Sequence, residues 1–155
     1  MTSYEKDLEA ARQEGLDVKE KRLKSDASAL ICGNRVAINI NKLSTTKEKS
    51  CVLAEERGHY QTTVGNILDL SIEENRKQEY RARLWGYDIK IGLLGLIRAF
   101  EHRCCTPHEA AEFLEVTDEY FMEAMNCYRE KYGICTSIDN YIICFIPTIR
   151  VIKLL

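Results

Sequence analysis

Residues 53–60 read LAEERGHY, and the interpretation of the whole chain depends on them. The stretch matches the helical metal-binding motif H-E-x-x-H except at its first position, where glutamate replaces histidine. Glu55 and His59 are four residues apart, so they lie about one turn apart on one helix face and can share a metal ion. Glu56 takes the position of the general base beside the metal-bound water. Glutamate is a legitimate zinc ligand, although this spacing also occurs by chance on solvated helix faces.

The residues around the motif carry a wider resemblance. Residues 49–67 (KSCVLAEERGHYQTTVGNI) and 75–83 (NRKQEYRAR) are similar to the active-site region of the ImmA/IrrE family of metallopeptidases, which are encoded beside phage-type repressors. In that family a glutamate shortly before a small residue on the following helix is the third metal ligand, and Glu79, followed by Ala82, takes that place. Further matches at residues 35–39 (RVAIN) and 138–143 (IDNYII) extend the resemblance over most of the chain.

The resemblance implies a zincin-like α+β fold. A small N-terminal β-hairpin or sheet would pack on the active-site helix, followed by a helical remainder and a C-terminal β segment. It also implies a metallo-endopeptidase that cleaves a helix-turn-helix repressor and so relieves repression of a phage or other mobile element. The implied metal ligands are Glu55, His59 and Glu79, and Glu56 is the implied catalytic base. Zinc is the leading candidate for the metal, with manganese or iron as alternatives.

Two glutamates and one histidine would give an unusual metal centre. The protein ligands contribute two negative charges, so a divalent centre becomes formally neutral. Such a centre should acidify its bound water less and polarise a scissile carbonyl less, which predicts slower hydrolysis and a higher pH optimum. More oxygen ligation also favours harder ions such as manganese or iron(II). The candidates for stabilising the oxyanion are Tyr60, Arg81, Arg83 and His102.

Each implied ligand also has an ordinary structural interpretation. Glu55 could be a solvated helix residue, Glu79 could pair with Arg76 or Arg83 at helical spacing, and His59 could be a core histidine. The functional alternative is therefore a zincin-shaped protein whose weak metal site does not cut, and which binds and sequesters a regulator. Whether Glu55 and Glu79 bind metal discriminates between the two functions.

Composition favours one cytoplasmic domain. With 155 residues and 45% hydrophobic content, the chain is long enough for a single core, predicted over residues 1–155 with a helical subregion at about 89–133. The 22 basic and 24 acidic residues give a net charge of −2, which offers no electrostatic argument for nucleic acid or membrane as a direct partner. The first residues contain no apolar signal core. The seven cysteines show no C-x-x-C spacing and are expected to be reduced thiols.

Periodicity and capping residues predict the order of the elements. The metal helix is expected to begin at Thr45 and to end at Gly65-Asn66. The strand directly before it is expected to be an edge strand that can pair with extended substrate. The remaining expected elements are a helix from Tyr4 to Gly15, a hairpin over 29–40 around Gly33-Asn34, a helix opened by Ser71, helices over 89–103, from Thr106 and from Thr117 to Gly133, and β structure over 134–155.

Residues 106–125 resemble a helix-turn-helix but lack its charge. Acidic residues occur at six positions of this window, and no lysine or arginine is present. Such a surface would repel phosphates, so the window is expected to pack within the protein or to bind a protein partner. A third reading of the chain, as a DNA-binding regulator, would require a basic surface that this window lacks.

Overall fold

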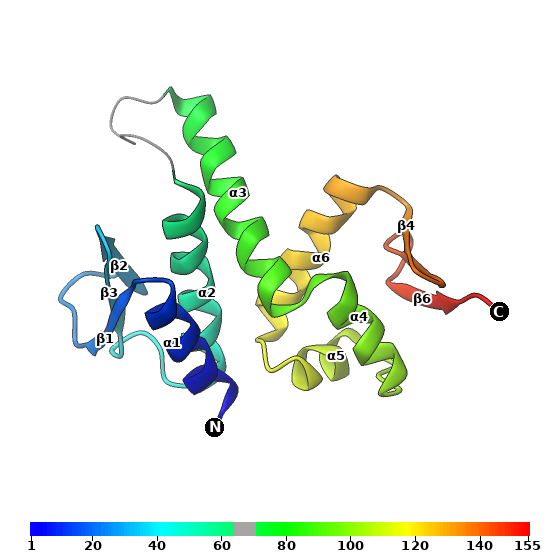
Figure 1. Ribbon diagram of the computed structural model, residues 1–155, viewed down its shortest axis with the longest axis horizontal. Helices are drawn as coiled ribbons and strands as arrows, with labels where there is room; N and C mark the ends of the chain where they lie inside the picture. Colours follow the sequence, from blue (N-terminus) through cyan, green and yellow to red (C-terminus); the bar gives the residue numbers. More distant parts are fainter. Residues whose placement is uncertain (64–70) are drawn as a thin grey trace. The chain divides into compact units, whose positions relative to one another are not determined.

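The computed structural model describes residues 1–63 and 71–155, and it confirms the predicted α+β class (Figure 1). The chain divides into two compact units, residues 1–86 and residues 87–155, and each is described by itself. The prediction of a single domain over 1–155 stays a prediction. The described elements are α1 (Ser3–Gln13), β1 (Asp17–Lys21), β2 (Ala29–Cys32), β3 (Arg35–Asn39), α2 (Thr46–Thr62), α3 (Ile72–Lys90), α4 (Gly92–Glu101), α5 (Pro107–Phe113), α6 (Asp118–Tyr132), β4 (Cys135–Ile138), β5 (Tyr141–Cys144) and β6 (Arg150–Lys153).

The first unit contains a three-stranded sheet in the order β1-β3-β2. β2 and β3 pair antiparallel around Gly33, which has a φ of 60°, so the predicted hairpin is confirmed. β1 pairs parallel to β3 and was not predicted. Its sequence, DVKEK, has Val18 as its one apolar residue and therefore shows no alternating pattern. The strand conformation of these residues therefore depends on main-chain pairing with β3.

The position of β3 corrects one expectation about the site. The strand directly before the metal helix was expected to be an edge strand, but β3 lies between β1 and β2. Val36 and Ile38 of β3 are almost fully buried, which is typical of a central strand packed under helices. The edge strand next to β3 on the hairpin side is β2, so any strand addition on that side would use β2.

The core of the first unit lies between one face of the sheet and the helices α1 and α2 (Figure 1). Leu53 of α2 is fully buried against Val36 and Ile38, and Tyr4 and Leu16 close the core from the α1 side. The opposite sheet face is open, with exposed side chains at Leu30 and Cys32. Because only one face is buried, the register of β3 is strongly specified.

Asn39 at the end of β3 is a fully buried polar residue that organises the loop between β1 and β2. Its Nδ2 donates to the carbonyl oxygens of Ser25 and Ala27, at 3.1 and 2.9 Å. Its Oδ1 accepts from the backbone amides of Leu23 and Asn41, at 3.2 and 3.1 Å. Both ends of the amide are therefore satisfied by backbone groups.

Replacing Asn39 by aspartate is expected to lower the free energy of unfolding by about 2 kcal/mol or more. The substitution keeps the shape but turns two donated hydrogen bonds into contacts between a buried carboxylate and two carbonyl oxygens. Urea unfolding of both proteins measures the difference. Asn41→Asp is the matched control, because Asn41 is exposed and its Nδ2 makes one bond, to the carbonyl of Leu23. Equal losses in the two variants would contradict this role of Asn39.

The starts of both site helices agree with the sequence. Thr45 caps α2 by accepting a hydrogen bond from the amide of Glu48 at 3.2 Å. Ser71 and Glu74 form the predicted capping box at the start of α3, each side chain accepting from the other residue's amide. The predicted end of the metal helix at Gly65-Asn66 lies outside the described residues.

The second unit contains α4, α5 and α6 and an antiparallel sheet in the order β4-β5-β6. Thr106 and Thr117 cap α5 and α6 as predicted, and Gly133 is the C-cap that follows the last residue of α6, Tyr132. The predicted helix over 89–103 is wrong at its start. α3 continues to Lys90, and α4 begins only at Gly92, whose φ of 63° interrupts the helical backbone.

Aromatic packing holds the second unit together. Phe121, Tyr128 and Phe145 are almost fully buried. The hydroxyl of Tyr128 donates to Asp88 at 2.9 Å and accepts from the amide of Gly92 at 3.2 Å. Burial raises the pKa of Tyr128 well above its ordinary value, so this phenol stays protonated as a donor. Within the described residues, no helix combines the length and the apolar character needed to cross a lipid bilayer.

Candidate metal centre

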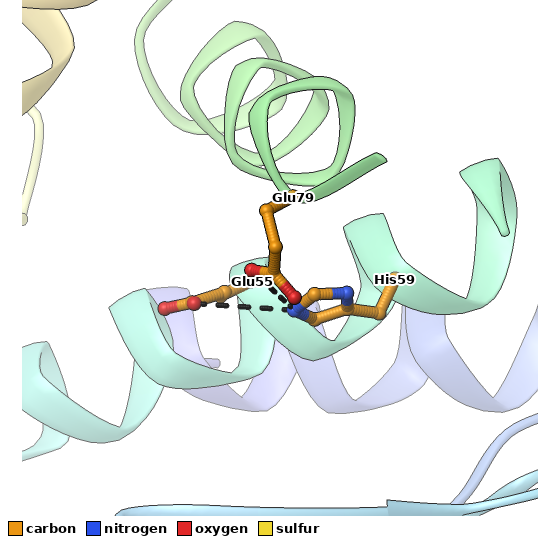
Figure 2. A group of neighbouring side chains, drawn as sticks. All are labelled: Glu55, His59 and Glu79. Carbon is orange, nitrogen blue, oxygen red and sulfur yellow. Dashed lines mark ion pairs between the residues drawn. The ribbon is translucent and has the colours of Figure 1, made fainter. Parts of the chain in front are cut away.

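Three of the sequence-predicted site residues converge in the first unit. Figure 2 shows Glu55 and His59 projecting from α2 toward Glu79 of α3. The Nε2 atom of His59 lies 3.6 Å from Oε2 of Glu79 and 4.0 Å from Oε1 of Glu55. One ligand atom from each side chain can be chosen so that all three lie within 4.8 Å of one another. Glu79 lies 20 residues after His59 and 24 residues after Glu55 in the sequence. The cluster therefore combines this distant residue with the pair that was predicted within α2.

These separations fit a common ion with small side-chain adjustments. Ligand atoms around a tetrahedral zinc ion lie about 3.4 Å apart, because bonds of about 2.1 Å meet near the tetrahedral angle. The separation between His59 and Glu79 is close to this value, and that between His59 and Glu55 is slightly longer. Glu55 and Glu79 are about half exposed, at 44% and 49% of their side-chain surfaces, so both can shift by rotamer. The donor set of two carboxylates and an imidazole suits zinc, manganese or iron(II).

The close approach of α3 to α2 is possible because Gly58 has no side chain. A Cβ at Gly58 would lie 2.1 Å from the carbonyl oxygen of Ala82, which is fully buried. Glu79 precedes Ala82 by three residues and therefore faces the same side of α3. The small residue at Ala82 was predicted from the sequence, whereas Gly58 was missed. The sequence did contain a signal for Gly58, because a glycine inside a helix lowers its stability and usually has a packing or functional reason.

Glu56 lies beside the cluster in a more enclosed position. Burial raises its pKa above the ordinary value, and the carboxylates of Glu55 and Glu79 raise it further, whereas His59 lowers it. A higher pKa makes a carboxylate a stronger base. An ion bound by the neighbouring ligands would lower this pKa again through its positive charge. The position suits a proton acceptor next to a metal-bound water.

A cleft opens in front of these residues. It has a volume of about 740 Å³ and is lined by Glu56, His59 and Glu79 together with residues 29–31 of β2. The cleft therefore joins the polar cluster to a sheet edge, and an extended peptide lying along β2 would pass the carboxylate of Glu56.

A buried ion pair links α2 to the end of α1. Arg57 is 7% exposed, and its guanidinium donates to both carboxylate oxygens of Glu14 at the end of α1. The same guanidinium lies over the ring of Trp85 at 5.3 Å. Sequence reasoning missed this contact, because Glu14 and Arg57 are far apart in the chain. The pair ties α1, α2 and α3 together around the candidate centre.

The four candidates for stabilising an oxyanion have different surroundings in the structure. Tyr60 lines the cleft, but its hydroxyl lies beside Gly15. Arg83 lies 3.9 Å from Glu79, one turn along α3. Arg81 is exposed on α3. His102 belongs to the second unit, where it stacks on Phe113. Among these candidates, Arg83 is the cation that contacts a predicted metal ligand.

The contact of Arg83 with Glu79 also supports the plainer interpretation of Glu79 as an ion-paired surface residue. The side chains of Arg83 and Glu79 are 55% and 49% exposed, and exposed ion pairs contribute little to stability. Glu79 lies closer to His59 than to Arg83. An ion pair with Arg83 alone does not explain why Glu55 and His59 also face this carboxylate.

Comparisons with models of known protein families, with curated proteins and with solved structures find no match to this chain. The resemblance of residues 49–67 and 75–83 to the ImmA/IrrE metallopeptidases stays a prediction from the sequence.

Proposed function

We propose that the protein is a zincin-like, metal-dependent endopeptidase that cleaves a helix-turn-helix repressor and so relieves repression of a phage or other mobile element. The observation that carries the proposal is the convergence of Glu55, His59 and Glu79 at the edge of a cleft that also contains Glu56. The resemblance to ImmA/IrrE metallopeptidases supplies the class of substrate.

The residues divide the chemistry among them. Glu55, His59 and Glu79 would hold a divalent ion, zinc or alternatively manganese or iron, which supplies an activated water and polarises the scissile carbonyl. Glu56 accepts the proton of the attacking water and passes it to the leaving amine. The edge of β2 orients an extended substrate along the cleft by main-chain hydrogen bonds. Helix approach at Gly58 sets the distance between the ligands of α2 and the ligand of α3.

A second candidate function is sequestration of a regulator without cleavage. It is favoured by the contact between Arg83 and Glu79, because this ion pair competes with a metal for the same carboxylate. A formally neutral centre would also be a weaker catalyst. In this case the cleft beside β2 would bind a peptide that is never cut.

A cleavage assay separates the two functions. The full chain, loaded with zinc or manganese, is incubated with the helix-turn-helix repressor encoded nearest to its gene, and the products are identified by mass spectrometry. We expect defined internal cleavage that a chelator abolishes and that metal restores. Stable binding of the intact repressor by the metal-loaded protein would favour sequestration. If the repressor is neither cleaved nor bound, the proposed substrate class is overturned.

A further inference from the structure

Strand register in the second unit places two cysteines directly opposite each other. Cys135 of β4 pairs with Cys144 of β5 in the antiparallel ladder. Directly opposed side chains of such a pair project from the same face of the sheet and interact across the strands. Cys135 is exposed, whereas Cys144 is buried. A reagent can therefore reach one thiol while the second lies across from it.

The hydrogen-bond pattern of the ladder determines how close the two residues are. Hydrogen-bonded and non-hydrogen-bonded pairs alternate along antiparallel strands. The amide of Phe145 donates to the carbonyl oxygen of Ile134 at 2.8 Å, so that pair is hydrogen-bonded. The next pair, Cys135 and Cys144, is then non-hydrogen-bonded, with Cα atoms typically about 4.5 Å apart. This separation lies within the range of roughly 4.4–6.8 Å that disulfides span.

The other cysteines lack this arrangement in the described part of the chain. Cys32 pairs across the strands with Arg35, and Cys51 and Cys127 are buried in helices. Cys104 and Cys105 are adjacent in the chain, and their thiols donate to the carbonyl oxygens of Glu109 and Arg103.

We propose that Cys135 and Cys144 form a reversible redox-modification site, which closes as an intramolecular disulfide when the protein meets a disulfide oxidant of the glutathione type. The thiolate of Cys135 attacks one sulfur of the oxidant, which forms a mixed disulfide and releases one reduced thiol. The thiolate of Cys144 then attacks the sulfur of Cys135 and releases the second. The protein loses two protons and two electrons, and one oxidant molecule becomes two thiols.

The bond would join β4 to a strand that is anchored on α6. Phe145 directly follows Cys144, and its carbonyl oxygen accepts from Nε of Arg129 at 2.9 Å. Its ring also stacks on Tyr132, with centroids 5.9 Å apart. Oxidation is therefore expected to protect the backbone amides of β4 from hydrogen exchange, because the strand can no longer separate from β5. This site is independent of the proposed peptidase activity.

Peptide mapping of the full chain tests the proposal. The protein is incubated with glutathione disulfide, its remaining thiols are alkylated, and it is digested with trypsin. Residues 132–150 contain no internal lysine or arginine, so both cysteines fall in one peptide. We expect this peptide to be lighter by two hydrogen atoms, with alkylation at both cysteines reduced more than about ten-fold. Chymotryptic cleavage after Tyr141 should leave two fragments joined by the disulfide.

Cys32 is the internal control, because it is exposed, has no opposing cysteine, and falls in a separate peptide, residues 25–35. It should remain open to alkylation or carry glutathione. Cys144→Ser should trap glutathione on Cys135, and reductant should reverse both products. Recovery of the peptide from oxidised wild-type protein with both cysteines alkylated, or with glutathione on Cys135 beside an alkylated Cys144, would overturn the proposal. The wild-type result does not depend on the folding of the variant.

Discussion

Glu56→Gln is expected to reduce the rate of peptide cleavage by a factor of about 10² to 10⁴, the usual contribution of a general base. The amide retains the size of the side chain and its place in the cleft, but it cannot accept the proton of the attacking water. Glu56 is not one of the three converging ligand residues, so metal content should be unchanged. Cleavage rate and metal content are measured on the same samples.

A matched control for this variant is Glu48→Gln. Glu48 lies on the same helix but in its first turn, where its amide bonds to the Thr45 cap. This variant should retain cleavage activity within a few-fold of the wild type. Equal cleavage by the wild type and by Glu56→Gln would remove Glu56 from the mechanism, even if the metal site itself is present.

Gly58→Ala is expected to destabilise the protein by about 2 kcal/mol or more and to lower its metal affinity. The new methyl group would lie 2.1 Å from the carbonyl oxygen of Ala82. Ordinary contact requires about 3.5 Å, so α3 must move away from α2 by more than about 1 Å. Metal sites tolerate deviations of only a few tenths of an ångström in ligand distance, so Glu79 would lose its place opposite His59.

Thermal unfolding and metal titration of this variant provide the measurement. The control is Gly95→Ala in α4, where a Cβ would first meet the flexible end of Leu114 at 3.4 Å. Alanine favours the helix by about 1 kcal/mol over glycine, so this control should be neutral or stabilising. A Gly58→Ala protein with wild-type stability and metal affinity would show that close helix approach does not position Glu79.

Local signals in the sequence accounted for much of the fold. Thr45, Ser71, Thr106 and Thr117 were recognised as helix starts because capping is a short-range interaction of one side chain with nearby amides. The hairpin around Gly33 followed from alternation and turn residues. β1 was missed because its side chains are mostly polar and its pairing with β3 is made by the backbone.

The prediction of the candidate site rested partly on local spacing and partly on family resemblance. The spacing of Glu55 and His59 is local to α2, but the contribution of Glu79 came from family resemblance, because no pattern links residues on two separate helices. Gly58 and the pair of Arg57 with Glu14 were missed because they depend on which elements come into contact. The prediction that β3 is an edge strand was wrong, because the sequence of one strand does not determine its position within a sheet.

The central claim is that Glu55, His59 and Glu79 bind a divalent metal ion. Elemental analysis of the purified full chain for zinc, manganese and iron tests it, beside the variant Glu79→Ala. Glu73→Ala is the matched control, because Glu73 is an exposed carboxylate on α3 that pairs with Lys77. We expect near-stoichiometric metal in the wild type and in the control, and loss of metal in Glu79→Ala. Wild-type protein without bound metal, even after reconstitution with each ion, would contradict the claim and leave sequestration of a regulator as the better account.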